Sequence, residues 1–534
     1  MKLPVGIQDF KKLRLNGYTY IDKTELVYRM ANNGEIYFLS RPRRFGKSLL
    51  MSTLRYYFQG ERELFKGLAI EQLEKDWVKY PVFHIDFNGN NYTDPNALLP
   101  MLEAKVAEWE NAYGFAGNTA LGVGERFKNF LAHVHATTGK KSVVLIDEYD
   151  KPMLDVLDSD LMAVQPDGQQ RKLEDHNREI LKAFYSTFKA ADADLRFVLL
   201  TGVTKFSQVS VFSGFNQPED ISLSFDYEAL CGITEEEIHT ALLPAVERLA
   251  ETLGKNIDDT FAALKRQYDG YHFSPAMTDV YNPFSVLSAL KQRQLRNFWF
   301  STGTPTYLIR LLNRCNERID ELTGRYYRAE EFIDYKADTE RPLPMIYQSG
   351  YLTIKHYDEM TDSFQLDFPN NEVRQGFLAV LASSYLAPSS GMVVPVVIQL
   401  VHALHANDLD TFRTTLTAFF ADIPYSMRRK DTERERERYF HYAFYLIFRL
   451  MSTYLVLTEK QQSQGRADCI IETPSAIYIF EFKLDGTPAD ALRQIGEKGY
   501  ARPYTADARP VIAVGADFSS ETGTIDGWEV KSIH

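Results

Sequence analysis

The amino-acid sequence predicts an α/β protein whose first part is a parallel sheet with helices on both faces. An apolar run at residues 36–39 leads into a Gly-Lys-Ser turn and then into a helix-like run that reaches residue 58. A second apolar run, at residues 143–146, ends in the acidic pair Asp147 and Glu148. Continuous apolar runs of this kind are typical of parallel strands buried on both faces. Ligands bind at the carboxyl ends of such strands, so both polar segments are expected at one edge of the sheet.

The Gly-Lys-Ser turn has the layout of a phosphate-binding loop. Backbone N–H groups at the start of the following helix favour a bound phosphate. Lys47 is expected to reach the β- and γ-phosphates, and Ser48 to coordinate Mg²⁺. Arg41 stands where the usual pattern has its first glycine, so an ordinary helix N-terminus is the alternative for this segment alone. The nucleotide-binding residues predicted in the loop are Arg43, Arg44, Phe45, Gly46, Lys47, Ser48 and Leu49.

The acidic pair after the second apolar run favours nucleotide hydrolysis. Asp147 is expected to bind Mg²⁺ beside Ser48, and Glu148 to polarise the attacking water as the catalytic base. A strand that merely ends in an acidic turn is the alternative. The acidic strand follows a phosphate-binding loop in the sequence, and this combination makes the acidic turn the weaker explanation.

Two further segments are expected to add strands to the same sheet. They are residues 81–87 and residues 196–204, the latter after a helix-like stretch at 178–188. An additional strand together with a glutamate after the aspartate is similar to the arrangement in AAA-like ATPases. Thr201 and Thr204 then fall where a polar sensor of the γ-phosphate would lie, and Thr201 is included among the predicted nucleotide-binding residues. A hydrogen-bonded turn threonine is the alternative.

The segments around this core have weaker signals. Residues 7–24 contain an expected aromatic strand at 18–21 and are a candidate to enclose the nucleotide base. Thr234 and Glu237 have the spacing of a capping box, which predicts that a helix begins there. Helical periodicity then continues to about residue 325, although the sequence FWFSTGTP at 298–305 interrupts it without an assigned role. A strand is expected at 345–354, and the alternating charges at 428–438 predict a solvated helix face.

The sequence near the C-terminus predicts a hairpin that carries charged residues. Two apolar runs flank residues 473–476, and a four-residue loop makes the numbers of paired residues sum to 949. Asp468 then lies opposite Glu481, about 5 Å away, and Lys483 shares their face. Two such carboxylates suit a hard divalent cation, and a lysine can position or activate a water for phosphodiester hydrolysis. An odd loop length would reverse the faces, and a cross-strand salt bridge is the alternative.

Two further residues are candidates to complete the same site. Glu437, at the start of an expected helix over 437–450, is a candidate third metal ligand, and Gln494 on the next helix is expected to face the site. The predicted metal ligands of the chain are therefore Ser48, Asp147, Asp468, Glu481 and Glu437.

Composition limits the class of protein. The chain has 534 residues, 45% hydrophobic and 25% charged, which is typical of a globular protein with two to four domains. Its net charge of −12 gives no overall nucleic-acid footprint, although it does not exclude a local basic groove. Three distant cysteines argue against a disulfide framework and a structural zinc site. The absence of an apolar leader and of an unbroken apolar stretch of about 20 residues predicts a cytoplasmic protein without a membrane partner.

The motifs of the first 230 or so residues resemble those of the AAA-ATPase-like family found in Bacteroidetes and other anaerobes. The resemblance rests on residues 3–7 (LPVGI), 20–24 (YIDKT), 39–49 (LSRPRRFGKSL) and 145–152 (LIDEYDKP). It implies that Arg41 belongs to the normal loop of that family. The last hundred residues resemble the PD-(D/E)XK nuclease superfamily, through Asp468, Glu481 and Lys483, with Glu437 and Gln494 as softer matches.

These inferences predict an ATP-binding and ATP-hydrolysing protein coupled to a metal-dependent nuclease. The expected cofactors are ATP and Mg²⁺, with Mn²⁺ as a second possibility at the nuclease site, and the expected partner is nucleic acid, with DNA preferred. Homo-oligomerisation is compatible with the sequence. The catalytic residues are expected to be Glu148, Asp468, Glu481 and Lys483. A nucleotide-gated signalling ATPase whose C-terminal domain binds without cutting is the main alternative, and a non-catalytic ATP-binding scaffold is a third.

The expected domains are an ATPase at residues 1–232, a helical lid at 233–325, a connecting region at 326–404 and a nuclease-like α/β domain at 405–534.

Overall fold

The computed structural model divides the chain into two compact units. The first comprises Met1–Thr302 and Leu322–Asn370, and the second comprises Gly303–Glu321 and Asn371–His534. The residues described are 1–157, 159–165, 168–206, 218–300, 308, 311–312, 315, 317–334, 341–386, 393–423, 433–451, 456–457, 461–462, 465–466 and 469–533. The predicted division into four parts at residues 232, 325 and 404 stays a prediction.

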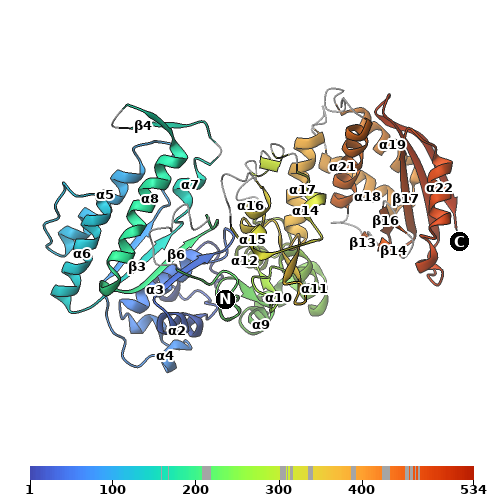
Figure 1. The fold of residues 1–534 in the computed structure, drawn as a ribbon. Helices are drawn as coiled ribbons and strands as arrows, with labels where there is room; N and C mark the ends of the chain where they lie inside the picture. Colours follow the sequence, from blue (N-terminus) through green and yellow to red (C-terminus); the bar gives the residue numbers. More distant parts are fainter. Residues whose placement is uncertain are drawn as a thin grey trace. The chain divides into compact units, whose positions relative to one another are not determined.

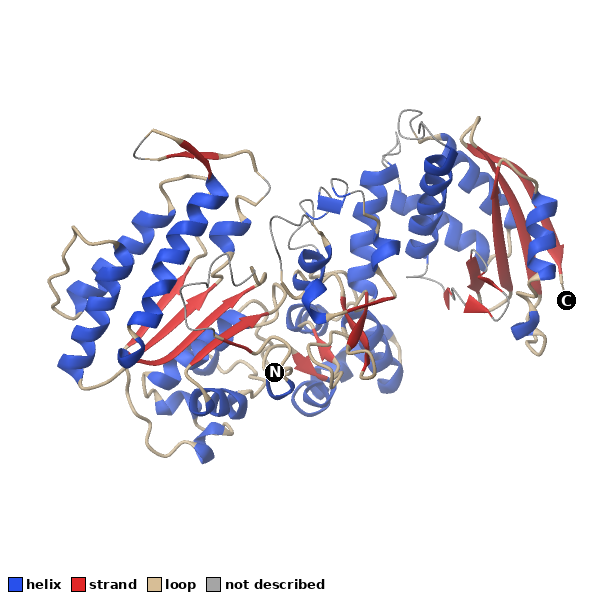
Figure 2. Ribbon diagram, in the orientation of Figure 1, coloured by secondary structure: helices blue, strands red, loops and turns tan. Residues whose placement is uncertain are grey.

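The first unit is built around a five-stranded sheet in which all neighbouring strands are parallel, as Figure 2 shows. The strands, in the order β2-β3-β6-β1-β7, are Val82–Asp86, Ser142–Asp147, Leu195–Gly202, Ile36–Ser40 and Glu219–Asp220. β6 therefore lies between the loop strand β1 and the acidic strand β3. Both additional strands predicted from the sequence are present, and the parallel sheet is confirmed.

Helices cover both faces of this sheet. Figure 1 shows α5, α6 and α8 on one face and α2, α3 and α4 on the other. α3 begins at Lys47, directly after the loop, and buries Leu50, Leu54 and Phe58 at the four-residue spacing of a helix face. The helices of this part of the chain are α1 (Phe10–Leu15), α2 (Thr24–Asn33), α3 (Lys47–Phe58), α4 (Ile70–Leu73), α5 (Leu98–Ala112), α6 (Val123–Thr138), α7 (Lys151–Leu154) and α8 (Leu173–Ala190).

The aromatic strand predicted at residues 18–21 is wrong. These residues are described and form no strand; the N–H of Thr19 donates to the carbonyl of Lys2 over 2.9 Å without a ladder. Tyr20 instead packs its ring on Phe10, with centroids 5.1 Å apart. Tyr20 thus packs against α1. Aromatic residues favour strands mainly because they favour burial, and here the burial comes from a helix and not from a sheet.

The predicted capping box at Thr234 is present. The Thr234 side chain accepts from the N–H of Glu237, and the Glu237 side chain accepts from the N–H of Thr234. The helices that follow bury a shared apolar core that includes Ile238, Val246 and Leu264. They are α9 (Glu235–Glu237), a π-helical turn (Ile238–Leu242), α10 (Leu243–Leu253), α11 (Ile257–Tyr268) and α12 (Pro283–Gln292), and a two-stranded ladder pairs β8 (Ile233–Thr234) with β9 (Val280–Tyr281).

The strand predicted at residues 345–354 is only partly correct. The structure places helix α16 at Leu343–Gln348, and strand β11 begins at Thr353. Pro344 lies in the first turn of α16, where a missing N–H costs nothing, so the apolar run starts as a helix. The surrounding elements are β10 (Arg325–Tyr327), α15 (Ala329–Phe332), β11 (Thr353–Asp358) and β12 (Ser363–Asp367), with sheet order β10-β12-β11.

The second unit contains a mixed five-stranded sheet packed between helices. Strand β17 pairs antiparallel with β16 and parallel with β18, and helix α22 joins β17 to β18. The strands, in the order β13-β16-β17-β18-β19, are Val456–Leu457, Cys469–Glu472, Ile477–Leu484, Val511–Ser519 and Thr524–Ser532. The helices are α14 (Ile319–Leu322), α17 (Asn371–Leu386), α18 (Val393–His405), α19 (Leu409–Ala421), α21 (Glu433–Met451) and α22 (Pro488–Glu497). α21 starts four residues before the helix start predicted at Glu437.

The remaining described elements are short. The two-stranded ladders are β4 (Met162–Val164) with β5 (Gln170–Lys172), and β14 (Gln461–Gln462) with β15 (Gly465–Arg466). The 3-10 turns are Arg62–Phe65, Asp192–Asp194, Phe225–Tyr227 and Arg502–Tyr504. None of the helices in the described part of the chain combines the length and the apolar character needed to span a bilayer.

Candidate functional site

The loop between β1 and α3 has the backbone geometry that a phosphate-binding loop requires. Arg44 and Gly46 both have positive φ, at 69° and 96°, so the chain turns sharply just before the helix. Gly46 is the residue that precedes the first helical turn, and left-handed geometry there costs a glycine little. The N-terminal N–H groups of α3 are thereby presented at the loop.

Lys47 and Glu148 lie together, as predicted. The ammonium of Lys47 donates to the carbonyls of Arg41 and Pro42 over 2.9 and 3.2 Å. Its Nζ lies 4.0 Å from Glu148 Oε1, and the Lys47 side chain is only 4% exposed. A buried ammonium that holds loop carbonyls is poised to exchange them for phosphate oxygens, because both are oxygen acceptors.

Asp147 lies behind Glu148 in the protein interior. It is buried, and its Oδ1 accepts from Thr201 Oγ1 over 2.7 Å and from the N–H of Glu148 over 3.1 Å. Glu148 itself has a φ of 53°, so the chain turns at this residue away from the direction of β3. Thr204, the other sensor candidate, directs its hydroxyl to Met345 Sδ at 3.6 Å. Thr201 is therefore the threonine in contact with the acidic pair.

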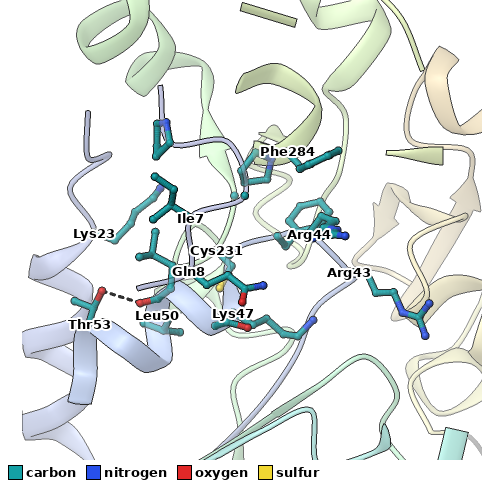
Figure 3. Close-up of a pocket in the computed structure, with 18 of the residues that line it drawn as sticks. Ile7, Gln8, Lys23, Arg43, Arg44, Lys47, Leu50, Thr53, Cys231 and Phe284 are labelled. Carbon is teal, nitrogen blue, oxygen red and sulfur yellow. Dashed lines mark hydrogen bonds between the residues drawn. The ribbon is translucent and has the colours of Figure 1, made fainter. Parts of the chain in front are cut away.

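A cavity of about 530 Å³ lies over the loop, which is a volume typical of small-molecule sites. The predicted residues Arg43, Arg44, Phe45, Gly46, Lys47, Ser48, Leu49 and Glu148 all line it. Asp147 and Thr201 do not line the cavity but support Glu148 from behind. Figure 3 shows Lys47, Arg44 and Phe284 around this space.

The N-terminal segment and residues from the region predicted to form a helical lid supply the other walls of the cavity. Ile7, Gln8 and Tyr20 come from the segment that the sequence made a candidate for enclosing a base. Ile233 and Phe284 come from the lid region. This part of the cavity is therefore mostly apolar, whereas the loop and Glu148 make the opposite part polar.

An ion pair and a cation–π contact connect the walls of the cavity. Lys23 of the N-terminal segment pairs with Glu237 of the lid, with Nζ and Oε1 2.5 Å apart. The guanidinium of Arg44 lies 5.2 Å from the ring centroid of Phe284 on α12. The helices that follow residue 233 are thus joined both to the segment before the loop and to the loop itself.

Arg41, the residue in place of the usual glycine, does not face the nucleotide cavity. Its guanidinium donates to the carbonyls of Ser40, Ser222 and Tyr227 over 2.9, 2.7 and 3.3 Å. The Phe273 ring centroid lies 4.1 Å from its Cζ, and burial lowers the pKa of Arg41. Arg41 therefore holds the end of β1 against neighbouring loops, and the phosphate loop needs no glycine at this position.

Asp150 is a site residue that the sequence analysis did not single out. It is fully buried, and its Oδ2 accepts from the N–H groups of Val203 and Thr204 over 2.9 and 2.6 Å. This pairing fixes the turn after Glu148 to the end of β6. The approach is so close that a Cβ on Gly202 would lie 2.7 Å from Asp150 Oδ1. Burial, with a smaller effect from the Glu148 charge, raises the pKa of Asp150 to about 7.

Replacing Asp150 with asparagine is expected to make stability less dependent on pH. The carboxyl group has a pKa of about 7 when folded and 3.8 when exposed, so its contribution is complete below pH 3.8 and is lost as the pH rises to about 7. Each pH unit within that window is worth up to about 1.4 kcal/mol. Asparagine keeps an oxygen acceptor for both N–H groups but carries no charge.

Urea unfolding of wild type and Asp150→Asn at pH 5 and pH 8 measures this effect. The difference in free energy of unfolding, variant minus wild type, is expected to be more favourable to the variant at pH 8 than at pH 5. Burial also raises the pKa of Asp269 to about 7, so this carboxyl group affects stability in the same pH window. Asp269→Asn is therefore measured alongside Asp150→Asn as the matched comparison. An Asp150→Asn curve parallel to that of wild type contradicts the assignment.

The carboxylates Glu235, Asp269 and Asp279 form a cluster that resembles a cation site, but a lysine fills it. Lys265 Nζ lies 2.6 Å from Glu235, 3.7 Å from Asp269 and 3.0 Å from Asp279. The ammonium already neutralises these groups, so the cluster is an ion-pair network within the lid.

The segment FWFSTGTP, which had no assigned role, contacts the phosphate loop in its described part. The indole N–H of Trp299 donates to the carbonyl of Arg43 over 3.0 Å. The Trp299 ring packs on Tyr351 with centroids 5.2 Å apart. An indole anchored to a backbone carbonyl of the loop restrains the loop's conformation, a role that the sequence pattern did not reveal. Residues 301–305 of the segment lie outside the described residues.

The C-terminal site brings together three of the predicted residues. Gln494 Nε2 donates to Glu481 Oε1, and Lys483 Nζ lies 3.4 Å from that oxygen and 2.6 Å from Gln494 Oε1. Glu481 is 2% exposed, and Lys483 is 28% exposed. The Glu481 carboxylate offers the oxygen ligands that a divalent cation prefers, and the Lys483 ammonium beside it can position a water nucleophile.

The hairpin register that placed these residues on one face is confirmed in its described part. Cys469 pairs with Phe480, and Glu472 with Ile477, so the paired numbers sum to 949 and four residues form the turn. Ile477 and Ile479 on the same face are packed against Ile495 of α22. Asp468 lies outside the described residues. Glu437 lies within α21, but its side chain also lies outside the described part.

Two family models match the chain. The one described as "Predicted AAA-ATPase" matches residues 4–212, and the one described as "PD-(D/E)XK nuclease superfamily" matches residues 435–528. A protein of Azotobacter chroococcum mcd 1, named "Uncharacterized protein in vnfD 5'region", is 37% identical over 547 residues. This alignment covers 100% of this chain and 99% of that protein.

Two solved structures show weaker similarity. The Aeropyrum pernix ORC2 protein, solved as ADPNP–ADP complexes, is 14% identical with a TM-score of 0.27, covering 68% of this chain and 94% of that one. Cdc6p from Pyrobaculum aerophilum is 11% identical with a TM-score of 0.23, covering 68% and 93%. TM-scores this low do not establish a shared overall fold.

Proposed function

Because the chain belongs to the family that combines a predicted AAA-ATPase domain with a PD-(D/E)XK nuclease superfamily domain, we propose that it hydrolyses ATP in its first unit and cleaves DNA in its second. The observation that carries the ATPase proposal is the placement of Lys47 4.0 Å from Glu148, both of them lining one cavity of about 530 Å³. A phosphate-binding lysine and a candidate base thereby face the same space.

The residues in and behind this cavity have different roles in the proposed hydrolysis. Lys47 exchanges the carbonyls of Arg41 and Pro42 for the β- and γ-phosphate oxygens. Glu148 orients the attacking water and accepts its proton as the water attacks the γ-phosphorus, while the bond from that phosphorus to the β–γ bridging oxygen breaks and ADP leaves. Thr201 holds Asp147 through the 2.7 Å hydrogen bond, which keeps the acidic turn in place. Ser48, which lines the cavity, would hold Mg²⁺ directly, and the buried Asp147 would act on the ion through a water or through Ser48; the ion supplies charge neutralisation at the phosphates when it is bound.

The apolar part of the cavity suits a purine base. Ile7 and Tyr20 from the N-terminal segment, together with Ile233 and Phe284 from the lid region, enclose that end. A base bound there touches both the segment before the loop and the helices after the sheet. ATP binding would therefore bring the lid and the N-terminal segment onto one ligand, as a nucleotide-controlled switch requires.

The second unit supplies the proposed nuclease site. Glu481 offers a buried carboxylate to a divalent ion, and Asp468 and Glu437 are proposed as its further ligands. Mg²⁺ or Mn²⁺ would there supply Lewis-acid activation of the scissile phosphate. Lys483, held by Gln494, is placed to position the attacking water or to stabilise charge that develops on the phosphate. Cytoplasmic location, homo-oligomerisation and the preference for DNA stay predictions.

Replacing Glu148 with glutamine is expected to separate hydrolysis from binding. Glutamine keeps the shape of the side chain but cannot accept the proton, so ATP turnover should fall by about 10²–10⁴-fold. ATP affinity should stay within a factor of a few. Phosphate release and titration with a fluorescent ATP analogue measure the two quantities.

Glu103→Gln, on the exposed surface of α5, is the matched control and should behave as wild type. Equal turnover by wild type and Glu148→Gln removes Glu148 from the chemistry. Absence of both binding and turnover in the wild-type protein rejects the ATPase proposal. ATP turnover without any cleavage of DNA in the presence of Mg²⁺ or Mn²⁺ supports the signalling alternative.

A further inference from the structure

We propose that Lys151 is a second phosphate-binding lysine, which contacts the terminal phosphate of ATP after it is released from Asp155. This inference rests on the proposed ATPase function and adds a catalytic residue to it. Lys151 and Asp155 both line the cavity that contains Lys47, Ser48 and Glu148.

The backbone fixes Lys151 at the polar end of the cavity. Lys151 is the first residue of α7, and its N–H donates to the carbonyl of Glu148 over 3.0 Å. Glu148 in turn lies 4.0 Å from the ammonium of Lys47. The apolar end, lined by Ile7 and Phe284, is built from other segments of the chain. A side chain anchored at Glu148 is therefore on the side of the cavity where the γ-phosphate must lie for Glu148 to act.

The present partner of Lys151 is a carboxylate of the same cavity. Lys151 Nζ lies 2.8 and 3.0 Å from the two Asp155 oxygens, at the four-residue spacing of a helix pair. The two side chains are 27% and 26% exposed. Ion pairs at this exposure are worth at most about 1 kcal/mol, so a multiply charged phosphate competes readily with Asp155 for the ammonium.

The charges among the lining residues favour such an exchange. They include three carboxylates, Asp86, Glu148 and Asp155, and five cations, Lys23, Arg43, Arg44, Lys47 and Lys151. A terminal phosphate placed for attack by a water on Glu148 lies close to that carboxylate, and Lys151, anchored to the Glu148 carbonyl, is the neighbouring cation that can offset the repulsion. Moving the Lys151 ammonium from Asp155 to the γ-phosphate gives the reacting group a second lysine in addition to Lys47. Charge spread over the equatorial oxygens in the transition state is stabilised by a cation of this kind.

An alternative is that the Lys151–Asp155 pair only stabilises the short helix α7. The two roles differ in their dependence on the nucleotide. A purely structural pair affects ADP and a triphosphate equally, because both need the same loop. A contact to the terminal phosphate affects the triphosphate alone.

Calorimetric titration of the full chain with ADP and with the non-hydrolysable triphosphate ADPNP, both with Mg²⁺, distinguishes these roles. Lys151→Met is expected to weaken ADPNP binding about tenfold, which is the loss of one charge-assisted hydrogen bond, and to leave ADP binding within a factor of two. Asp155→Asn, which removes the competing carboxylate and keeps Lys151, is expected to strengthen ADPNP binding. Lys189→Met, on the exposed surface of α8, is the matched control for loss of a lysine.

The result that overturns the inference is an equal effect of Lys151→Met on both nucleotides, or no effect on either. If Lys151→Met does not fold, Asp155→Asn decides: unchanged or weaker ADPNP binding overturns the inference as well. These outcomes leave the ATPase proposal intact, because wild type still binds ATP. Wild-type protein that binds neither ADP nor ADPNP rejects both.

Discussion

Replacing Lys47 with alanine is expected to abolish ATP turnover, with a loss of about 10³-fold or more, as for removal of a main electrostatic contact to a reacting group. The Lys47 ammonium is buried at the start of α3, where it is held by two loop carbonyls. Alanine removes the cation that the loop carbonyls of Arg41 and Pro42 hold in place for the phosphates. The other cations of the cavity lie at other positions and do not replace it. ATP binding is expected to weaken together with turnover.

Phosphate release and binding of a fluorescent ATP analogue, measured on folded protein as judged by circular dichroism, provide the test. Lys189→Ala on the exposed surface of α8 is the control for loss of a lysine. Turnover that persists in Lys47→Ala shows that another residue binds the phosphates. That outcome removes the role assigned to Lys47.

Replacing Lys483 with alanine is expected to abolish nicking of plasmid DNA while ATP turnover stays unchanged. Lys483 is within 3.4 Å of Glu481 and bonds Gln494, so its removal takes away the cation beside the reacting phosphate. A loss of about 10²-fold or more is expected from the removal of one such stabilising group. ATP turnover depends on residues of the other unit, so it serves as an internal measure of folding.

A plasmid-nicking assay with Mg²⁺ and with Mn²⁺, with and without ATP, measures the first quantity. Lys498→Ala is the matched control, because this exposed lysine follows α22 directly and is not among the contacts of Glu481. Equal nicking by wild type and Lys483→Ala shows that the cleavage has another source. If the wild-type protein does not cut DNA in any nucleotide state, the second unit is better explained as a binding module.

The sequence predicted the parts of the fold that depend on short-range pattern. The run before Gly46 and the run before Asp147 form neighbours of the same strand, β6, because buried parallel strands have continuous apolar sequences. The hairpin register followed from the turn, since a four-residue turn and a two-residue side-chain period leave one pairing that buries Ile477 and Ile479. Both inferences needed only local sequence.

Other parts depend on contacts between distant segments and were not predictable. Asp150 gains its role from the N–H groups of Val203 and Thr204, which follow more than fifty positions later. Trp299 finds the carbonyl of Arg43 across 256 positions. The expected strand at 18–21 failed for a related reason, since its aromatic residues had a packing partner in Phe10 rather than a strand. Local sequence patterns show which side chains are apolar, but not which distant segment they pack against.

The discontinuous make-up of the second unit affects how such a chain can be rearranged by recombination. Its smaller stretch, 303–321, lies between two parts of the first unit in the sequence. The Arg318 guanidinium lies 4.6 Å from the ring centroid of Tyr442, whose hydroxyl accepts from the N–H of Ile319 over 3.4 Å. A single crossover at residue 370 between two homologous genes would pair these partners from different parents. Exchange of the whole second unit without any of the first therefore requires three crossovers, one at each boundary between the units, which favours transmission of the whole gene as one block.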